Sequence, residues 1–210
     1  MGIENLAVER AKQLFGADYV NVRFHSVTQA NISVYSAVLK PGDTVLRVNF
    51  SCEGNFNFID YEVEKDTGCI NYENVFGIAF KHKPKLIIAG TYSYPRKIDF
   101  FQLQEVAEEV GAMLMVDMSC IVGLVAAGLY PSPIPYADFV TTTTAESLRG
   151  PEGGVVMCKR KYASLIDKAV LTHIKGTHML PDIAGVEAAL KEAFSQEFKA
   201  YQEQTVKKEH

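Results

Sequence analysis

Short apolar runs alternate with longer amphipathic stretches along this chain, and this alternation constrains its fold more than any other feature. Residues 85–89 and 114–118 are nearly continuous apolar runs, as in parallel strands buried on both faces of a sheet. In the stretches around them, apolar residues recur at helical spacing. Alternating strands and helices predict one α/β domain over residues 1–210, with a mostly parallel sheet between helices.

The expected elements follow from this periodicity and from turn and cap signals. The expected helices are 3–15, 26–39, 72–82, 99–111, 121–128 and 182–207. The expected strands are 19–24, 44–49, 85–89, 114–118, 139–144 and 153–159. Residues 50–71 are expected to form a loop with one short edge strand at 69–71, and the charge run 60–66 is expected to be solvated. Ligands of such sheets bind beyond the carboxyl ends of the strands, so the loops there are the candidate site.

Charge balance and hydropathy exclude several classes of protein. A net charge of −4 favours neither nucleic acid nor an anionic membrane surface as a partner. No apolar run approaches the roughly 20 residues that a membrane-spanning helix needs. The N-terminal stretch is amphipathic and contains acidic residues, unlike a signal peptide, so we expect a cytoplasmic protein.

The four cysteines are widely spaced, and none belongs to a CxxC or Cys/His cluster. They are Cys52, Cys69, Cys120 and Cys158. This spacing argues against a zinc site, so no metal is expected. In a cytoplasmic protein they should be free thiols, mostly buried as small apolar residues.

One stretch, TTTTAESLRGPEGG at 141–154, has the sequence pattern of a functional loop but lacks reactive side chains. It runs from a strand-like threonine run through a turn into Gly-Gly and a second strand. Its centre, Ala145-Glu146-Ser147, offers no nucleophile or base with a partner beside it. A glutamate, Glu146, therefore occupies the centre of a loop that has the pattern of a functional site.

Several long stretches carry a resemblance to one family. They are RAKQLFGADYVNV, SVTQANISVYSAVLKPGDTVL, HKPKLIIAG, VDMSCIVGLVAAGLYPSPIPYADFVTTTT, GPEGGVVMCK and IAGVEAALKEA. On these stretches the chain resembles the large domain of serine hydroxymethyltransferase, a pyridoxal-phosphate (PLP) enzyme, which implies the fold-type-I PLP-transferase fold. The resemblance covers the middle of the family's sequence, and full members are roughly twice as long. The N-terminal arm and the C-terminal small domain are therefore expected to be absent.

The resemblance implies that the central functional position of the family is changed here. After the threonine run the family has His-Lys, and that lysine forms the Schiff base with the PLP aldehyde. The two positions hold Ala145 and Glu146 in this chain, and a carboxylate cannot form an imine. The aspartate that pairs with the pyridine nitrogen corresponds to Asp117 and is retained, whereas the histidine three residues later is replaced by Cys120.

Other contacts that the family makes with the cofactor are also altered. Asn55 replaces the histidine that stacks on the ring, and Tyr92 replaces a serine. Residues 26–28 correspond to a phosphate-cupping Ser-Gly-Ser, with valine in place of the glycine that allows close backbone approach. The glycine-rich segment that reaches a neighbouring subunit's phosphate corresponds to 172–181, where only part of the glycine pattern is kept. The expected vestigial pocket comprises Ser26, Val27, Thr28, Asn55, Tyr92, Asp117, Cys120, Ala145 and Glu146.

Each of these side chains also has a structural interpretation. Asp117, Ser26 and Thr28 can cap helices without any cofactor. Glu146 is expected to be solvated or hydrogen-bonded rather than a general base. Cys120 is expected to fill the core rather than act as a nucleophile.

The other candidate side chains are expected to have local roles. His25 and His173 should hydrogen-bond to nearby groups. Neither Lys97 nor Lys159 is at the family position, and neither is expected to replace the lost lysine.

These losses favour a catalytically inactive homologue. The resemblance implies a dimer with its sites between subunits, so we expect a homodimer, or a heteromer in which the chain regulates or completes a serine-hydroxymethyltransferase-like relative. No cofactor is expected, because the covalent link and several contacts are lost together. Two alternatives stay open. One is a PLP-dependent hydroxymethyltransferase, or a subunit of a split one, acting on glycine and serine in one-carbon metabolism. The other is a small-molecule binding module that uses the vestigial pocket.

Overall fold

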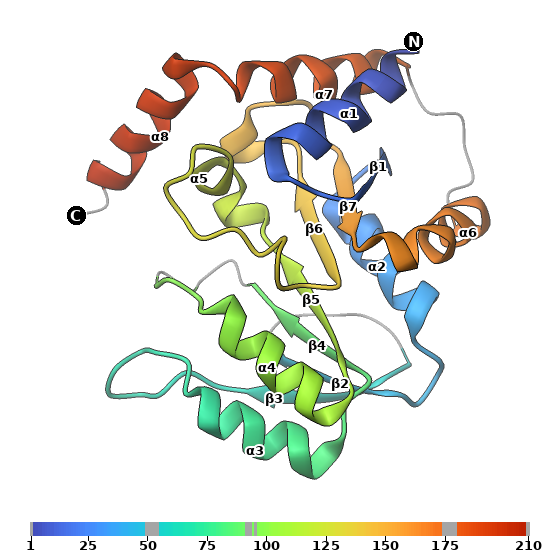
Figure 1. The fold of residues 1–210 in the computed structure, drawn as a ribbon, viewed down its shortest axis with the longest axis vertical. Helices are drawn as coiled ribbons and strands as arrows, with labels where there is room; N and C mark the ends of the chain where they lie inside the picture. The colour runs from blue at the N-terminus through green and yellow to red at the C-terminus, as the bar shows by residue number, and fades with distance from the viewer. Residues whose placement is uncertain (1, 49–54, 91–93, 95, 174–179, 209–210) are drawn as a thin grey trace.

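Seven strands form one sheet through the middle of the molecule, in the order β1-β7-β6-β5-β4-β2-β3 (Figure 1). The computed structural model describes residues 2–48, 55–90, 94, 96–173 and 180–208. The strands are β1 (Tyr19–Phe24), β2 (Thr44–Val48), β3 (Asn57–Tyr61), β4 (Leu86–Ala89), β5 (Met113–Asp117), β6 (Phe139–Thr143) and β7 (Gly154–Cys158). The helices are α1 (Ile3–Phe15), α2 (Val27–Val38), α3 (Tyr72–His82), α4 (Phe100–Val110), α5 (Val122–Ala126), α6 (Ala163–His173), α7 (Leu180–Glu192) and α8 (Gln196–Lys208). The 3-10 turns are η1 (Ser119–Ile121), η2 (Glu146–Leu148) and η3 (Arg160–Tyr162).

The sheet is mostly parallel, as the alternation of strands and helices predicts. The pairs β2–β3, β2–β4, β4–β5 and β5–β6 are parallel. Among these strands β7 alone runs opposite to the others, since it pairs antiparallel with both β1 and β6. The carboxyl ends of β4, β5 and β6 therefore meet at one edge, which we call the carboxyl edge; the opposite one is the amino edge. The predicted site loops follow the strands at the carboxyl edge.

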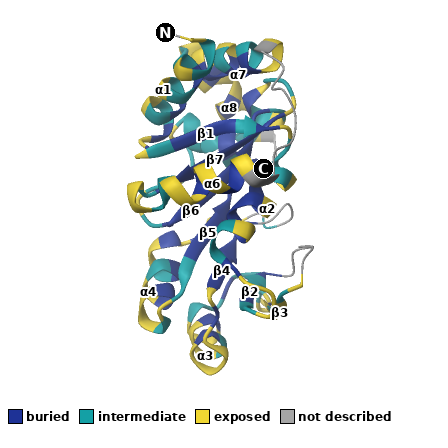
Figure 2. Ribbon diagram, turned by 90° about the vertical axis from the view of Figure 1, so that its right-hand side faces the viewer, coloured by how far each residue is buried: buried dark blue, intermediate teal, exposed yellow. Residues whose placement is uncertain are grey.

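Helices cover both faces of the sheet and form two hydrophobic clusters with it. On one face α1, α3, α4, α5, α7 and α8 pack on residues that include Ile87 and Leu114. On the other face α2 and α6 pack on residues that include Ile88 and Met115. Adjacent strand residues thus belong to opposite clusters, as the pleat requires. Figure 2 shows the central strands buried, which explains why they are continuous apolar runs.

The predicted helix ends are confirmed at the residues that supply the caps. α1 ends at Gly16, whose φ of 73° lies in the left-handed region that glycine adopts without strain. Ser26 caps α2 by accepting a hydrogen bond from Gln29 N at 3.2 Å. Asp99 caps α4, and Gly111 ends it, again with a left-handed φ.

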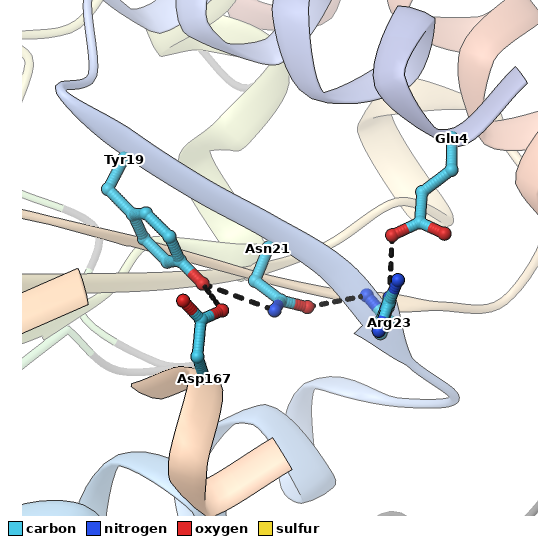
Figure 3. Close-up of polar contacts among 5 residues, drawn as sticks. All are labelled: Glu4, Tyr19, Asn21, Arg23 and Asp167. Carbon is cyan, nitrogen blue, oxygen red and sulfur yellow. Dashed lines mark hydrogen bonds and ion pairs between the residues drawn. The ribbon is translucent and has the colours of Figure 1, made fainter. Parts of the chain in front are cut away.

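Polar side chains tie the edge strand β1 to a helix at each of its ends (Figure 3). Tyr19 donates a hydrogen bond to Asp167 on α6, and Arg23 Nε donates to Glu4 on α1 at 2.5 Å. Asn21 joins the two, since its Nδ2 donates to Tyr19 Oη at 3.3 Å and its Oδ1 accepts from Arg23 N at 3.0 Å. Burial, and then the bond to Asp167, raise the pKa of Tyr19 above its usual value. Charged groups along an edge strand hinder pairing with another chain.

The prediction of a short edge strand at 69–71 is wrong. The edge strand in this region is β3, at residues 57–61, at the opposite edge of the sheet from β1, and the 69–71 segment contributes only an isolated bridge. The charge run begins inside β3, where Asp60 pairs with Arg47 at 2.8 Å and Tyr61 is buried rather than solvated. Asn57 and Asp60 are exposed in this edge strand, so its sequence looks like that of a loop.

The helices near the C-terminus also differ from the prediction. The expected single helix over 182–207 is two, α7 and α8, because Ser195 Oγ accepts a hydrogen bond from Phe198 N at 3.1 Å and starts a new helix. α6 was not predicted, and its exposed Leu165 and Leu171 blur the apolar stripe that would reveal it. Across the described ranges, no helix combines the length and apolar character required to span a membrane.

Candidate functional site

Asp117 ends β5 at the carboxyl edge, and protein groups bind both of its carboxylate oxygens. Oδ1 accepts hydrogen bonds from Ser119 N at 3.0 Å and from Ser119 Oγ at 2.6 Å. Oδ2 accepts one from Asn31 Nδ2 at 2.8 Å. Asp117 as a whole is 7% exposed. Its bond to Ser119 N forms a local turn just before η1, but the N-cap position of η1 is Met118, so Asp117 does not occupy the cap that the helix-capping interpretation gives it.

Asp117 belongs to a buried polar network that links α2, β5 and β6. Thr141 Oγ1 donates to Asn31 Oδ1 at 2.6 Å, so the Asn31 amide is held at both ends. Ser119 Oγ also accepts from Thr143 N at 3.2 Å. Removing one partner from such a network leaves another group buried and unsatisfied, at a cost of about 1–3 kcal/mol.

Sequence reasoning missed Asn31 and Ser119. Asn31 lies one turn into α2, beside Ala30 and Val34 on the face that packs against the sheet. A polar residue on an otherwise apolar helix face is the signal that could have revealed it. Ser119 carries no such signal, because only the fold of η1 turns it toward Asp117.

The N-terminus of α2 is closed by its own side chains. Ser26 Oγ accepts from Gln29 N, and Gln29 Oε1 accepts from His25 N at 2.8 Å, which resembles a capping box. Val27 is half-buried, and Thr28 is exposed inside the helix rather than at its cap. The oxygen of the Ser26 hydroxyl thus serves as the cap of α2, whether or not a phosphate binds there.

Glu146 is exposed and opens the turn η2 with a φ of 48°, in the left-handed region that costs a non-glycine residue about 1–2 kcal/mol. Neighbouring contacts hold this turn. Ser147 Oγ accepts from Gly123 N at 3.0 Å, and its carbonyl accepts from Gln202 Nε2 of α8 at 2.9 Å. Ala145, which precedes Glu146, donates its N–H to Thr143 Oγ1 at 3.2 Å. The turn therefore belongs to the packed framework and needs no ligand to hold it.

The glycines after this turn are required by packing, which explains why they are kept although the Schiff-base lysine is absent. A Cβ at Gly150 would lie 2.6 Å from Thr144 O, and one at Gly154 would lie 2.3 Å from Ser26 O. Both distances are far inside van der Waals contact. The Gly-rich frame is thus required to bring β6, β7 and α2 together, whatever the site binds.

Cys120 is exposed, which corrects the expectation that it fills the core. η1 directs Ser119 inward, at 1% exposure, and leaves the next residue at the surface. Partial desolvation, followed by the charges of Glu146 and Asp117, raises the pKa of the Cys120 thiol to about 11. It is therefore protonated at neutral pH and a poor nucleophile. Of the three cysteines in the described ranges, all free thiols, only Cys158 is buried.

Several predicted site residues are not brought to the carboxyl edge. Asn55 lies at the amino edge, because its carbonyl accepts from Gly42 N just before β2 begins. Lys159 also lies there, with Nζ 3.1 Å from Asp138 Oδ1 before β6. Lys97 is exposed ahead of α4.

Tyr92 lies outside the described residues, as does most of the 172–181 segment with the side chain of His173. The site that can be described therefore consists of Ser26, Val27, Thr28, Asn31, Asp117, Ser119, Cys120, Ala145 and Glu146.

These side chains do not fit covalently attached PLP, the cofactor that the resemblance implies. Glu146 has no amine to condense with the aldehyde. Asp117, which would pair with the pyridine nitrogen, already accepts three hydrogen bonds from Ser119 and Asn31. Within the described part of the chain, the residues at this edge offer no route to Schiff-base chemistry.

A comparison with protein families matches almost the whole chain. The model described as serine hydroxymethyltransferase matches residues 2–56 and 50–210. The two stretches overlap in the connection between β2 and β3. The mostly parallel sheet between helices is consistent with the fold-type-I PLP-transferase fold. The chain thus belongs to the serine hydroxymethyltransferase family and is a relative of PLP-dependent hydroxymethyltransferases.

Proposed function

We propose that this chain is a non-catalytic member of the family that acts by association with a serine-hydroxymethyltransferase-like chain, either a second copy or an active relative. The observation that carries the proposal is Glu146, an exposed carboxylate where the family places its Schiff-base lysine. Without an amine at that position, covalent attachment of PLP and the chemistry that depends on it are not expected.

The contacts around Asp117 support a site that is complete without a cofactor. Ser119 and Asn31 satisfy the carboxylate from within the chain, at 2.6–3.0 Å. A buried carboxylate left waiting for a ligand would instead carry an unmet desolvation cost. What remains functional in this proposal is the surface of the domain, in a family that is normally oligomeric.

Co-expression of the tagged chain with an untagged, active serine hydroxymethyltransferase tests the proposal. We expect the active enzyme to co-purify, or the chain alone to have at least twice its 23.2 kDa mass by light scattering at micromolar concentration. An unrelated fold-type-I PLP enzyme, co-expressed in the same way, is the matched control and should not co-purify. A strictly monomeric chain that ignores the active enzyme would overturn the proposal.

Retention of Asp117 favours a second candidate, a PLP-dependent enzyme whose cofactor is held by a partner chain or without a covalent link. Absorbance between roughly 330 and 430 nm after PLP addition and desalting tests this candidate. Borohydride reduction followed by peptide mapping would identify any lysine that carries the cofactor. A single, stoichiometric lysine adduct would favour the enzyme and contradict the non-catalytic proposal.

A further inference from the structure

α3, which lies at one end of the molecule (Figures 1 and 2), carries two exposed phenylalanines. Phe76 is 39% exposed and Phe80 is 58% exposed, and their ring centroids lie 5.9 Å apart. They are four residues apart, so they project from the same side of the helix. The outer side of a surface helix is normally polar, and exposed aromatic residues of this kind mark interaction surfaces.

A hollow of about 430 Å³ lies beside Phe76, between α3 and α4, and we call it the α3–α4 groove. Its apolar part is formed by Tyr72, Phe76 and Val106. Its polar part is formed by Glu73, Gln102, Glu105 and Glu109. An apolar floor with polar groups around it is the usual composition of a binding surface.

The rim of the groove carries three carboxylates. Glu73, Glu105 and Glu109 are all exposed. Among the ion pairs formed by the described residues, none includes these three carboxylates. The residues described as lining the groove include neither lysine nor arginine. A cationic partner would relieve this repulsion, whereas nucleic acid and anionic lipid would add to it.

The shape of the groove fits a helix. On α4 the lining residues are Gln102, Glu105, Val106 and Glu109, which follow the i, i+3, i+4, i+7 spacing of one helical stripe. Seven residues of helix rise about 10 Å, so the stripe is about two turns long. A third helix laid between α3 and α4 would meet both of them side by side.

We propose that the α3–α4 groove binds an amphipathic helix of a partner protein. The helix presents an apolar stripe to Phe76 and Val106, and lysine or arginine residues beside that stripe to Glu73, Glu105 and Glu109. This proposal goes beyond the association proposed above. It concerns a partner of different chemistry, and it stands or falls without regard to pairing with a serine hydroxymethyltransferase.

Fluorescence anisotropy of the full chain with a designed peptide tests the proposal. The probe is a labelled, alanine-based helix of about 14 residues with leucines at i, i+3 and i+7 and lysines beside them. We expect saturable binding that weakens as salt rises. Glu105→Lys should weaken it by about tenfold or more, as should Phe76→Ala, which removes the aromatic anchor. Circular dichroism confirms that each variant is folded.

Matched controls distinguish binding at the groove from non-specific attraction between the charges of the peptide and the protein. Glu203→Lys makes the same charge change at an exposed position on α8 and should leave affinity unchanged. Equal weakening by Glu105→Lys and Glu203→Lys would overturn the proposal, because it would reflect net charge alone. Equal binding of a peptide with shuffled leucines and lysines would also overturn it. The proposal would also be overturned if the chain associated with itself and Phe76→Ala abolished that association, because a second copy of the chain would then occupy the groove.

Discussion

At the scale of single residues, groups within the chain satisfy the buried carboxylate of Asp117. Asp117 has Ser119 and Asn31 as hydrogen-bond donors, and Asn31 in turn has Thr141. A buried charge is tolerated when each of its lone pairs that faces protein is satisfied. Asp117 is thus better understood as a structural residue here than as a site waiting for a ligand.

Asp117→Asn should lower the free energy of unfolding by about 1–3 kcal/mol. An amide has one acceptor oxygen, so it can serve Ser119 or Asn31 but not both, and its own N–H groups meet donors. Urea midpoints with an unchanged m value measure the loss. Glu146→Gln is the matched control, the same chemical change at an exposed position, and should stay within about 0.5 kcal/mol. Similar costs for both variants would contradict the role given to Asp117.

Alkylation of Cys120 should depend steeply on pH. A thiol with a pKa of about 11 has only about one thiolate per thousand molecules at pH 8, so its rate should rise about tenfold per pH unit toward pH 11. Because Glu146 contributes to this raised pKa, Glu146→Gln should lower the pKa and speed alkylation at pH 8. The rates are measured with iodoacetamide in a chain whose other cysteines are replaced by alanine. A plateau near pH 9 would show that the thiol is not perturbed.

At the scale of elements, caps and buried strands are predictable because their signals are local. Asp99 and Gly111 bracket α4 in sequence as they do in space. β3 is not predictable in this way, since its identity as a strand comes from pairing with β2, and of its five residues only Tyr61 is fully buried. The residues of the candidate site also differ in how far the sequence predicts them. The placement of Glu146 follows from a motif, whereas the contacts of Asn31 and Ser119 depend on how α2 and η1 pack.

Two glycine substitutions distinguish the effect of close packing on stability from the effect of helix propensity. Gly90 follows β4 with a φ of 96°, and a Cβ there would lie 1.9 Å from the carbonyl oxygen of Asp117. Gly90→Ala should therefore destabilise the protein by more than about 2 kcal/mol, since both the backbone and the contact resist it. Gly77, inside α3, has nothing within 4 Å of such a Cβ, so Gly77→Ala should stabilise by about 0.5–1 kcal/mol. Thermal or urea unfolding of the two variants checks the signs, and a Gly90→Ala protein as stable as the parent would refute the close contact with β5.

At the scale of the whole molecule, the candidate site is a junction that holds the two faces of the sheet together. Asn31 belongs to α2 on one face, and Gln202 of α8, from the other face, bonds the carbonyl of Ser147. The carboxyl edge is tied by helices from both layers. Because hydrogen bonds within the chain already hold this edge together, a ligand there should add little to the stability of the protein.

The melting temperature should therefore not respond to the cofactor that the family uses. Any ligand that binds only the native state adds RT ln(1 + [L]/Kd), about 2.7 kcal/mol at a hundredfold excess over Kd, which is several degrees for a chain of this size. Pyridoxamine phosphate is the better probe, because it keeps the ring and phosphate but lacks the aldehyde that reacts with surface lysines. We expect no shift with it, while an active serine hydroxymethyltransferase freed of cofactor should shift upward in the same assay. A saturable rise of several degrees for this chain, lost in Asp117→Asn, would show that the Ser119 and Asn31 contacts yield to the pyridine ring and that the site still binds its family's cofactor.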